Sequence, residues 1–416
     1  MILRGDDPVS VACTPAASPV RVRGAVTPSR GERVPLMTIA GEWSRIGITG
    51  FGGPSAHIAL FRKLCVEEHK WLPAREFEDG IAATSLLPGP TSTQLAIFCA
   101  WRLRGLLGAL LGGLCFITPG LVIIVALSSL FFAHHAPKWV LGAELGAGAG
   151  VPAVAVSSAL GLLPAAWKRV RGEAAKERLW ILYLVVGGAA AATAGQFLAL
   201  ALLACGAFEV GRERWAGRAQ PQRLAGSLPL LVVAPALGGI ASLAWVAFKV
   251  GALSYGGGFV IVPLMQHDAV SAYHWMTNAQ FLNAVALGQI TPGPVVQTVA
   301  VVGYAARGLD GGLLAAGVAF APSFVFVTVG APHFDRIRAS EGVQAFLTGA
   351  GACAIGAIAG VAVPLSLEIG HLWQAGLAAL AAVALLGLRR NVVIVLLTCG
   401  LLGVVAAAAG APTGAL

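Results

Sequence analysis

The feature that most constrains this fold is a stretch of ten residues, built on proline-glycine-proline, that occurs twice in the chain. Residues 86–95 contain Pro88-Gly89-Pro90, and residues 289–298 contain Pro292-Gly293-Pro294. The two prolines that open these triplets lie 204 residues apart. Other glycine, aromatic and leucine positions match at the same offset without a gap: Gly47 with Gly251, Phe51-Gly52-Gly53 with Tyr255-Gly256-Gly257, Leu60 with Leu264, Trp71 with Trp275, Phe77 with Phe281, and Gly108 with Gly312. Because glycine and proline interrupt helices, the matches predict a duplicated unit with a helix break at the same place in each copy.

The low charge content and the long apolar runs define the class of protein. Only 11% of the 416 residues are charged and 57% are hydrophobic, whereas soluble domains average about 25% charged residues. Apolar runs such as 106–132, 151–163, 179–208, 313–329 and 392–409 are long enough to cross or enter a bilayer core of about 30 Å. We therefore predict an all-α polytopic membrane protein whose many glycines allow close helix packing in the lipid bilayer.

The net charge of +9 does not indicate nucleic-acid binding. Lysine and arginine are concentrated in short loops between apolar segments, as the positive-inside rule describes, and no basic aromatic module is present. The seven cysteines are scattered, odd in number and without a CxxC motif. We interpret them as packing residues and expect neither a disulfide framework nor a metal site.

Four regions follow from the composition along the chain. Residues 1–36 are rich in proline, serine and arginine and lack the apolar core of a signal peptide, so we expect a disordered cytoplasmic arm. Translation from Met37, which opens the first organised segment, stays an alternative. Residues 37–208 are predicted as the first membrane half, residues 209–227 as a basic cytoplasmic linker, and residues 228–416 as the second membrane half.

Two loops that correspond in the halves differ in charge. The loop 62–75 holds four basic residues, Arg62, Lys63, Lys70 and Arg75, whereas its counterpart 266–279 holds none. Because cytoplasmic loops carry the excess of positive charge, we expect the two loops on opposite sides of the membrane. The homologous halves are therefore predicted to be inverted-topology repeats with helices broken at Pro-Gly-Pro, an arrangement that recurs in transporters.

Each Pro-Gly-Pro break frees backbone N–H and C=O groups inside the membrane, where they are tolerated only within protein or at a watered cavity. A new helix begins after each break, and the N–H groups of its first turn have no helical partner. The first turns contain Thr91, Ser92, Thr93 and Gln94 in the first half, and Val295, Val296, Gln297 and Thr298 in the second. Neutral donors at the positive end of a helix favour an anion, and the acids that a cation carrier usually needs are nearly absent from the apolar segments.

These motifs resemble those of the chromate ion transporter family. The matching pieces are Phe51-Gly52-Gly53-Pro54 with His57, Leu87-Pro88-Gly89-Pro90 with Gln94, Tyr255-Gly256-Gly257-Gly258, and Gln289-Ile290-Thr291-Pro292-Gly293-Pro294 with Gln297. The resemblance covers nearly everything from Thr38 onward, including the duplication of long-chain, two-domain members. It implies a multi-pass protein of the bacterial inner membrane that exports chromate, confers chromate resistance, and exchanges chromate for sulfate or confuses the two. The first half has Gly-Gly-Pro where the second has Gly-Gly-Gly, so the site is expected to be at best pseudo-symmetric.

We predict a substrate site formed by both breaks and the motifs beside them. Its residues are Gly52, Gly53, Pro54, His57, Pro88, Gly89, Pro90, Thr91, Ser92, Gln94, Gly256, Gly257, Gly258, Gln289, Thr291, Pro292, Gly293, Pro294 and Gln297. Arg102, Lys249 and Glu144 are candidate charge partners. A structural alternative applies to each group: the breaks are then packing kinks, the polar residues cap and join helices, and His57 is a buried packing residue.

The predicted function is secondary transport of an oxyanion, chromate, driven by an ion gradient, because the sequence has no P-loop for ATP. Sulfate or another anion as cargo is the main alternative. A passive channel or a non-transporting membrane subunit is an alternative of another class, and a homodimer is one assembly compatible with the sequence. An enzyme is not expected, since the sequence has no dinucleotide fingerprint, haem motif or Cys/His cluster, and hence no cofactor site.

Overall fold

The computed structural model describes residues 34–85, 87–133, 137–193, 197–217, 239–254, 261–330 and 340–413. Every regular element in these ranges is a helix, which confirms the all-α prediction. Four helical stretches in them are long and apolar enough to cross a membrane: Thr91–Phe131, Lys138–Trp167, Val295–Gly330 and Glu341–Leu367. Shorter apolar helices, Ile240–Leu253, Leu372–Gly387 and Val392–Ala408, accompany them.

The first half begins with α1 (Leu36–Thr49) and α2 (Pro54–Arg62), which has Pro54 at its first position. The π-helix η1 (Lys63–Glu68) and α3 (Ala74–Thr84) lead to Pro88–Pro90, called here the first break. The helix after it, α4 (Thr91–Phe131), is kinked at Arg104 and Gly105. Helices α5 (Lys138–Trp167), α6 (Ala174–Thr193) and α7 (Leu198–Trp215) follow. Helix α7 ends inside the range 209–227 predicted as a linker, while residues 1–33 of the predicted arm and residues 218–238 lie outside the described ranges.

The second half repeats this order of elements. Helices α8 (Ile240–Leu253) and α9 (Ile261–Gln266), the π-helix η4 (His267–Ala272) and α10 (Asn278–Ile290) lead to Pro292–Pro294, the second break. The 3-10 turn η5 (Val295–Gln297) continues into α11 (Thr298–Gly330), which is kinked at Arg307 and Gly308. The chain then forms α13 (Glu341–Gly360), α14 (Ala362–Leu367), α15 (Leu372–Ala382), the π-helix η7 (Val383–Gly387) and α16 (Val392–Ala408).

Irregular backbone features recur at the 204-residue offset. The π-helices η1 and η4 begin and end at matching positions, and each is followed by a residue with positive φ, Lys70 at 52° and His274 at 51°. Stacked ring pairs also match: His69 with Trp71, centroids 4.3 Å apart, and Tyr273 with Trp275, centroids 4.8 Å apart. Positive φ is uncommon outside glycine, so these shared details extend the sequence match to the backbone conformation.

The ungapped match predicted from the sequence is interrupted at the second break. It pairs Gly108 with Gly312, but Gly108 packs on the carbonyl of Ala100, and Gly311 packs in the same way on the carbonyl of Gly303. The pairing of Gly108 with Gly312 is therefore wrong by one residue, and the offset becomes 203 beyond the second break. The 3-10 turn η5 is the reason, because it is tighter than the α-helical first turn of α4 and uses one residue fewer before the kink.

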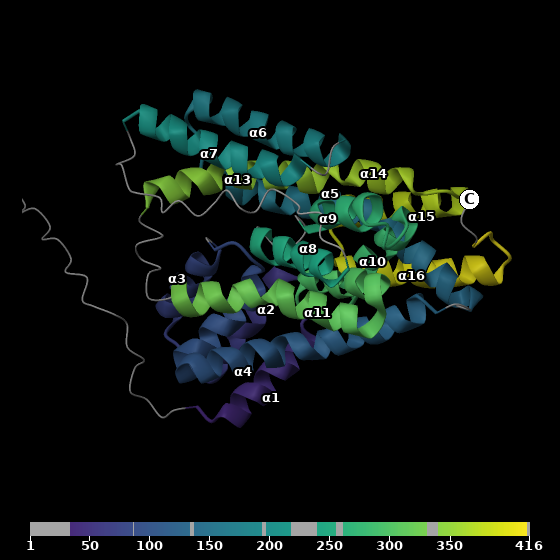
Figure 1. The fold of residues 1–416 in the computed structure, drawn as a ribbon, viewed down its shortest axis with the longest axis horizontal. Helices are drawn as coiled ribbons and strands as arrows, with labels where there is room; N and C mark the ends of the chain where they lie inside the picture. The colour runs from purple at the N-terminus through teal and green to yellow at the C-terminus, as the bar shows by residue number, and fades with distance from the viewer. Residues whose placement is uncertain are drawn as a thin grey trace, which may run out of the picture.

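The two halves are interlocked. Helix α5 of the first half packs against α15 and α16 of the second, and α13 of the second half packs against α6 and α7 of the first. Figure 1 shows α6 and α7 lying along α13 on one side of the bundle, with α1 and α4 on the opposite side. The long kinked helices α4 and α11 also pack against each other. Each half therefore depends on the other for its packing.

Glycines allow close contact at both interlocking interfaces. A methyl group on Gly142 in α5 would overlap the carbonyl oxygen of Gly403 in α16. In the same way, a methyl group on Gly356 in α13 would overlap the carbonyl oxygen of Leu184 in α6. Because small residues let helix backbones approach one another in a membrane, these positions set the spacing of the interlocked helices.

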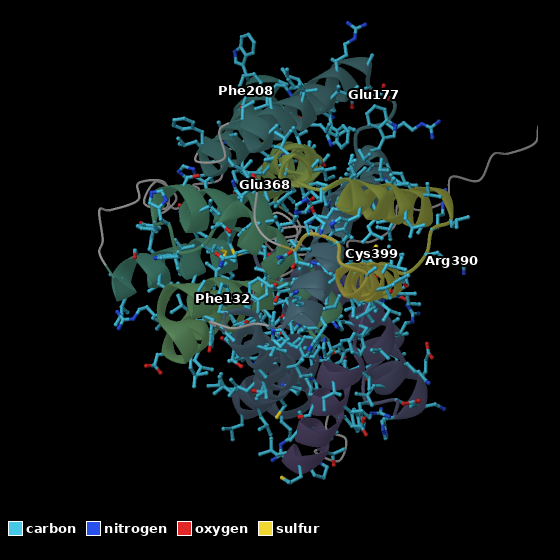
Figure 2. All side chains as sticks on the ribbon, turned by 90° about the vertical axis from the view of Figure 1, so that its right-hand side faces the viewer. Phe132, Glu177, Phe208, Glu368, Arg390 and Cys399 are labelled. Atoms are coloured by element: carbon cyan, nitrogen blue, oxygen red, sulfur yellow. The ribbon has the colours of Figure 1, made fainter. Side chains whose placement is uncertain are left out.

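A buried ion cluster joins α6 to α7. The Glu209 carboxylate, 5% exposed, accepts a hydrogen bond from the Tyr183 hydroxyl at 2.9 Å and pairs with Arg212 at 2.5 Å. Glu209 is the first residue of the range 209–227 predicted as a basic cytoplasmic linker, yet it is buried, and these two partners satisfy its charge. The exposed Arg390, labelled in Figure 2, lies by contrast at the outer edge of the bundle.

Candidate functional site

The two breaks meet through a reciprocal pair of backbone hydrogen bonds. The N–H of Gly89 in the first break donates at 2.5 Å to the carbonyl of Ser254, the residue that ends α8 of the second half. The N–H of Gly293 in the second break donates at 3.1 Å to the carbonyl of Gly50, the residue that ends α1 of the first half. Each break thus bonds to the end of a helix in the other half, and we call these four residues the junction.

Backbone conformation explains why glycine stands at the centre of each break. Gly89 has a φ of +121° and Gly293 a φ of +95°, in a region that residues with a Cβ rarely adopt. The prolines on either side lack an N–H group and therefore cannot continue the preceding helix. Pro90 and Pro294 then stand at the N-caps of α4 and η5. The local sequence alone thus interrupts the helix at both places.

A buried glutamine follows each break. Gln94 donates from Nε2 to the carbonyl of Pro88 at 2.6 Å, and Gln297 donates from Nε2 to the carbonyl of Ile117 in α4 at 2.8 Å. Both side chains are 0% exposed, and neither Oε1 has a hydrogen-bond partner among the described residues. Gln94 therefore holds its own break, whereas Gln297 ties the second break to the long helix of the first half.

His57 on α2 supports the junction. Its Nε2 lies 2.8 Å from the carbonyl oxygen of Gly50, and because a carbonyl only accepts, Nε2 carries the proton. The ring is 0% exposed and packs edge-on against Phe116, with centroids 5.1 Å apart. Its other nitrogen, Nδ1, has no partner in the described part of the chain. His57 thus fixes the Gly50 carbonyl and keeps one nitrogen unused.

Buried polar atoms without a hydrogen-bond partner gather at the breaks. The described residues contain thirteen such side-chain atoms, and seven of them belong to residues in or beside the breaks: His57, Thr93, Gln94, Ser254, Gln289, Gln297 and Ser323. Leaving a buried donor or acceptor without a partner costs about 1–3 kcal/mol, so such atoms are few in folded proteins unless water or a ligand satisfies them. Their concentration makes the junction the candidate binding site.

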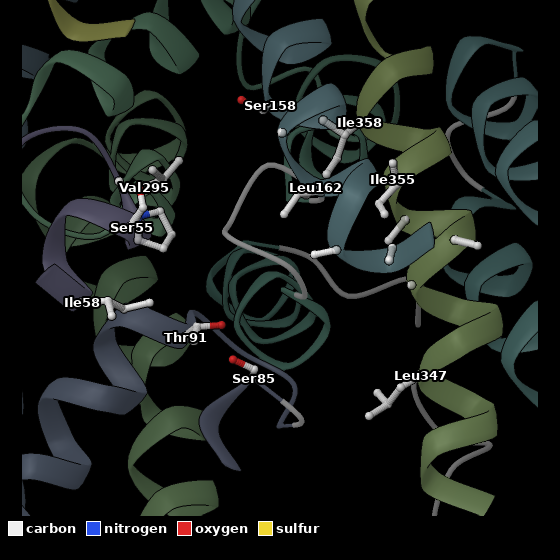
Figure 3. Close-up of a pocket in the computed structure, with 18 of the residues that line it drawn as sticks. Ser55, Ile58, Ser85, Thr91, Ser158, Leu162, Val295, Leu347, Ile355 and Ile358 are labelled. Atoms are coloured by element: carbon white, nitrogen blue, oxygen red, sulfur yellow. The ribbon is translucent and has the colours of Figure 1, made fainter. Parts of the chain in front are cut away.

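A cavity of about 520 Å³ adjoins the first break. Figure 3 shows the Ser85 and Thr91 side chains on one side of this cavity and those of Leu347 and Ile355, on α13, on the other. The exposed Arg169, just after the end of α5, supplies a positive charge to the lining. Small-molecule sites commonly measure about 300–1,000 Å³, so this cavity has room for a small ligand and its water.

The structure brings many of the predicted site residues to this region. Gly52, Gly53 and Pro54 line the cavity, as do Thr91 at the first position of α4 and Gln289 near the end of α10. Ser92 is buried in the first turn of α4, and the Thr291 hydroxyl donates to the carbonyl of Leu287 at 2.9 Å, a bond within its own helix end. The predicted residues Gly256, Gly257 and Gly258 lie outside the described ranges.

Two of the three candidate charge partners are in ion pairs. Arg102 lies roughly 16 Å along α4 from Thr91 and pairs with Glu76. Lys249 in α8 pairs with Asp268 in η4 at 2.5 Å. Glu144 in α5 has a buried Oε1 without a hydrogen-bond partner among the described residues. The polar side chains at the junction itself are therefore mainly neutral ones.

Sequence reasoning missed several polar residues in this region, among them Ser254, Ser323 and Arg169. Ser254 occupies the position that Gly50 has in the first half, and Ser323 the position of Gly120 at the corrected offset of 203. Comparing the halves for positions where glycine is exchanged for a hydroxyl residue would have found Ser254 at the offset of 204, and Ser323 once the offset is corrected to 203. Arg169 gave no such signal, because it is one of several basic residues in the same loop.

Comparison with known proteins agrees with this architecture. The sequence profile of the chromate transporter family matches residues 37–210 and 241–404. The chain is 33% identical over 335 residues to the chromate transport protein of Cupriavidus metallidurans, and this alignment covers 77% of this chain and 80% of that protein. It is 29% identical over 419 residues to the chromate transport protein of Pseudomonas aeruginosa, and this alignment covers 95% of this chain and 98% of that protein. No solved structure matches the chain. The matches span both halves, so this multi-pass membrane protein belongs to the chromate transporter family.

Proposed function

We propose that this protein is a secondary transporter that exports chromate across the bacterial inner membrane and thereby confers chromate resistance. The names of the relatives suggest the cargo. The observation that carries the proposal in this chain is the junction, where reciprocal backbone hydrogen bonds join the breaks of both halves. Buried polar atoms without partners surround the junction, and a cavity of about 520 Å³ lies beside it. We assign the substrate site to the junction and this cavity.

The chemistry of the junction suits a tetrahedral oxyanion. Chromate is a small dianion whose oxygens accept hydrogen bonds, and its shape and charge resemble those of sulfate. The first turn of α4 offers N–H groups at the positive end of a long helix, together with the hydroxyls of Thr91, Ser92 and Thr93. Neutral donors bind the anion without a permanent ion pair, which would have to be broken before release.

Alternating access follows from the interlocked halves. If the halves are inverted, as the loop charges predict, movement of one helix group against the other exposes a site at their junction first to one side and then to the other. The bond from Gly89 to Ser254 and the bond from Gly293 to Gly50 occupy equivalent positions. Lengthening one while the other holds would give two related conformations, each open to one side.

Uptake of labelled chromate into everted membrane vesicles tests this function. Vesicles containing the protein are compared with vesicles from cells that lack it, with and without a proton gradient and with excess sulfate. We expect saturable accumulation that depends on the gradient. Accumulation that does not saturate and ignores the gradient would instead indicate a channel, and no accumulation by folded protein would contradict chromate as cargo. Inhibition by sulfate would show that the site recognises shape and charge.

Replacing Arg169 with glutamine is expected to weaken chromate capture from solution. Arg169 lines the cavity, and without its positive charge a dianion in the cavity would lose an attraction that corresponds to a roughly three- to tenfold rise in the half-saturation concentration. The maximal rate should change little, because the residue lies at the cavity wall and not in a break. Arg171→Gln, which alters an exposed arginine two residues away, is the matched control. Equal kinetics for both variants would contradict a role for Arg169.

A further inference from the structure

The asymmetry of the junction points to a single oxyanion site. We propose that this site lies at the first break, and that Ser254 and Ser323 of the second half supply hydroxyl donors to it. The proposal rests on the function proposed above and specifies which residues of that site hold the anion. It predicts that the two breaks, despite their matching sequences, have different roles.

Ser323 is placed to serve the first break. It belongs to α11, is 0% exposed, and its Oγ has no hydrogen-bond partner among the described residues. This Oγ lies 3.2 Å from the position that a Cβ on Gly89 would take. The hydroxyl therefore lies beside Gly89 and close to the side-chain amide of Gln94, whose Nε2 also borders that position, directly before the first turn of α4.

Ser254 approaches the same break from α8. Its carbonyl accepts the hydrogen bond from the N–H of Gly89, and its side chain is 0% exposed. The Oγ of Ser254 also has no partner in the described ranges. The second half thus gives two buried, unused hydroxyls to the first break, and Thr93 adds a third in the first turn of α4.

Among the described residues, no hydroxyl stands at the second break in the positions that Ser254 and Ser323 have at the first. The positions of Ser254 and Ser323 are taken by Gly50 and Gly120 in the first half. A side chain at Gly120 is excluded, because a methyl group there would overlap the carbonyl oxygen of Pro292. The turn after the second break contains Val295 and Val296 where the first has Thr91, Ser92 and Thr93. Hydroxyl donors are therefore concentrated at the first break. The second break instead contacts two glycines of the first half, Gly50 and Gly120.

Unused hydroxyls are not the rule in these helices. The buried Ser128 in α4 donates to the carbonyl of Ile124 at 2.7 Å, and Thr298 in α11 donates to the carbonyl of Val295 at 2.8 Å. Serine and threonine in helices commonly bond in this way to the preceding turn. Because Ser254 and Ser323 do not, their O–H groups remain available to the oxygens of an oxyanion, the ligand class that hydroxyl and N–H donors suit.

The test compares three alanine variants in the chromate uptake assay. Ser323→Ala and Ser254→Ala should each raise the half-saturation concentration about tenfold, since each removes a hydrogen bond to a charged ligand. Ser128→Ala, which removes an equally buried hydroxyl that is already bonded within its helix, should leave it unchanged. Size-exclusion chromatography in detergent checks that all three variants are folded. Should one serine variant fail to fold, the cysteine replacement at that position, which keeps the size but donates weakly, should show the same rise.

The outcomes separate this inference from the proposed function. If the wild-type protein transports chromate and both serine variants keep the wild-type half-saturation concentration, the single site at the first break is refuted while the function stands. If the folded wild-type protein does not transport chromate, the proposed function fails, and thermal stabilisation by sulfate tests the site on its own. Stabilisation that is lost in Ser323→Ala but kept in Ser128→Ala then supports the site, and equal stabilisation of both variants refutes it.

Discussion

Replacing Gly89 with alanine is expected to abolish chromate transport while the protein still reaches the membrane. The φ of +121° at Gly89 belongs to a region that is essentially restricted to glycine, and a Cβ there costs about 1–3 kcal/mol. The added methyl group would also overlap Nε2 of Gln94, which holds the carbonyl of Pro88, and would lie 3.2 Å from the Oγ of Ser323. The substitution therefore changes the break and the proposed anion site together.

The Gly89 prediction has a matched control in Gly172. Gly172 lies in an exposed turn with a φ of +108°, and a Cβ there would meet no atom within 4 Å. Gly172→Ala thus introduces comparable backbone strain without touching the junction, and its transport should stay near the wild-type rate. The measurement is the initial rate of uptake in everted vesicles, divided by the amount of protein in the membrane. A Gly89→Ala rate within twofold of the wild type would contradict a central role for the first break.

The sequence predicts the helices well because apolar runs and their interruptions act locally. The predicted segment 392–409 corresponds to α16 (Val392–Ala408), and the segment 313–329 lies within α11, which ends at Gly330. Pro54 and the Gly50–Gly53 turn mark the boundary between α1 and α2 through their own backbone preferences. The packing of α5 against α16 has no such local sequence signal, because it depends on contacts between glycines that lie far apart in the chain.

The same distinction applies to the candidate site: features that act locally could be predicted from the sequence, and contacts between the halves could not. The two breaks could be predicted because Gly89 and Gly293 act through their own φ angles and the prolines through their missing N–H groups. The reciprocal hydrogen bonds could not, since each joins residues of different halves. Ser323 was missed for the same reason: its side chain matters only where α11 passes the first break. The one-residue slip at η5 also hid its equivalence with Gly120 behind an ungapped comparison.

Replacing Gly356 with valine is expected to prevent stable folding, because it wedges α13 away from α6. Even a methyl group on Gly356 would overlap the backbone carbonyl of Leu184, and backbone cannot move aside as a flexible side chain does. Overpacking typically costs about 1–3 kcal/mol and occasionally more, and backbone overlap lies at the costly end; α13 also packs on α7, so the damage extends across the interlocked half. We expect little monodisperse protein in detergent and a lower midpoint of thermal unfolding for what remains.

The control for this last prediction is Gly317→Val on α11. Gly317 is also in the middle of a long helix, but it is exposed, and a Cβ there would meet no atom within 4 Å. Both variants place a β-branched residue in a helix and pay the same small cost in helix propensity, so a difference between them measures the contact alone. If Gly356→Val unfolds at the same temperature as Gly317→Val, α6 and α13 are not held at the distance that the structure gives them. The packing between the two halves, on which the junction depends, would then differ from the packing in this structure.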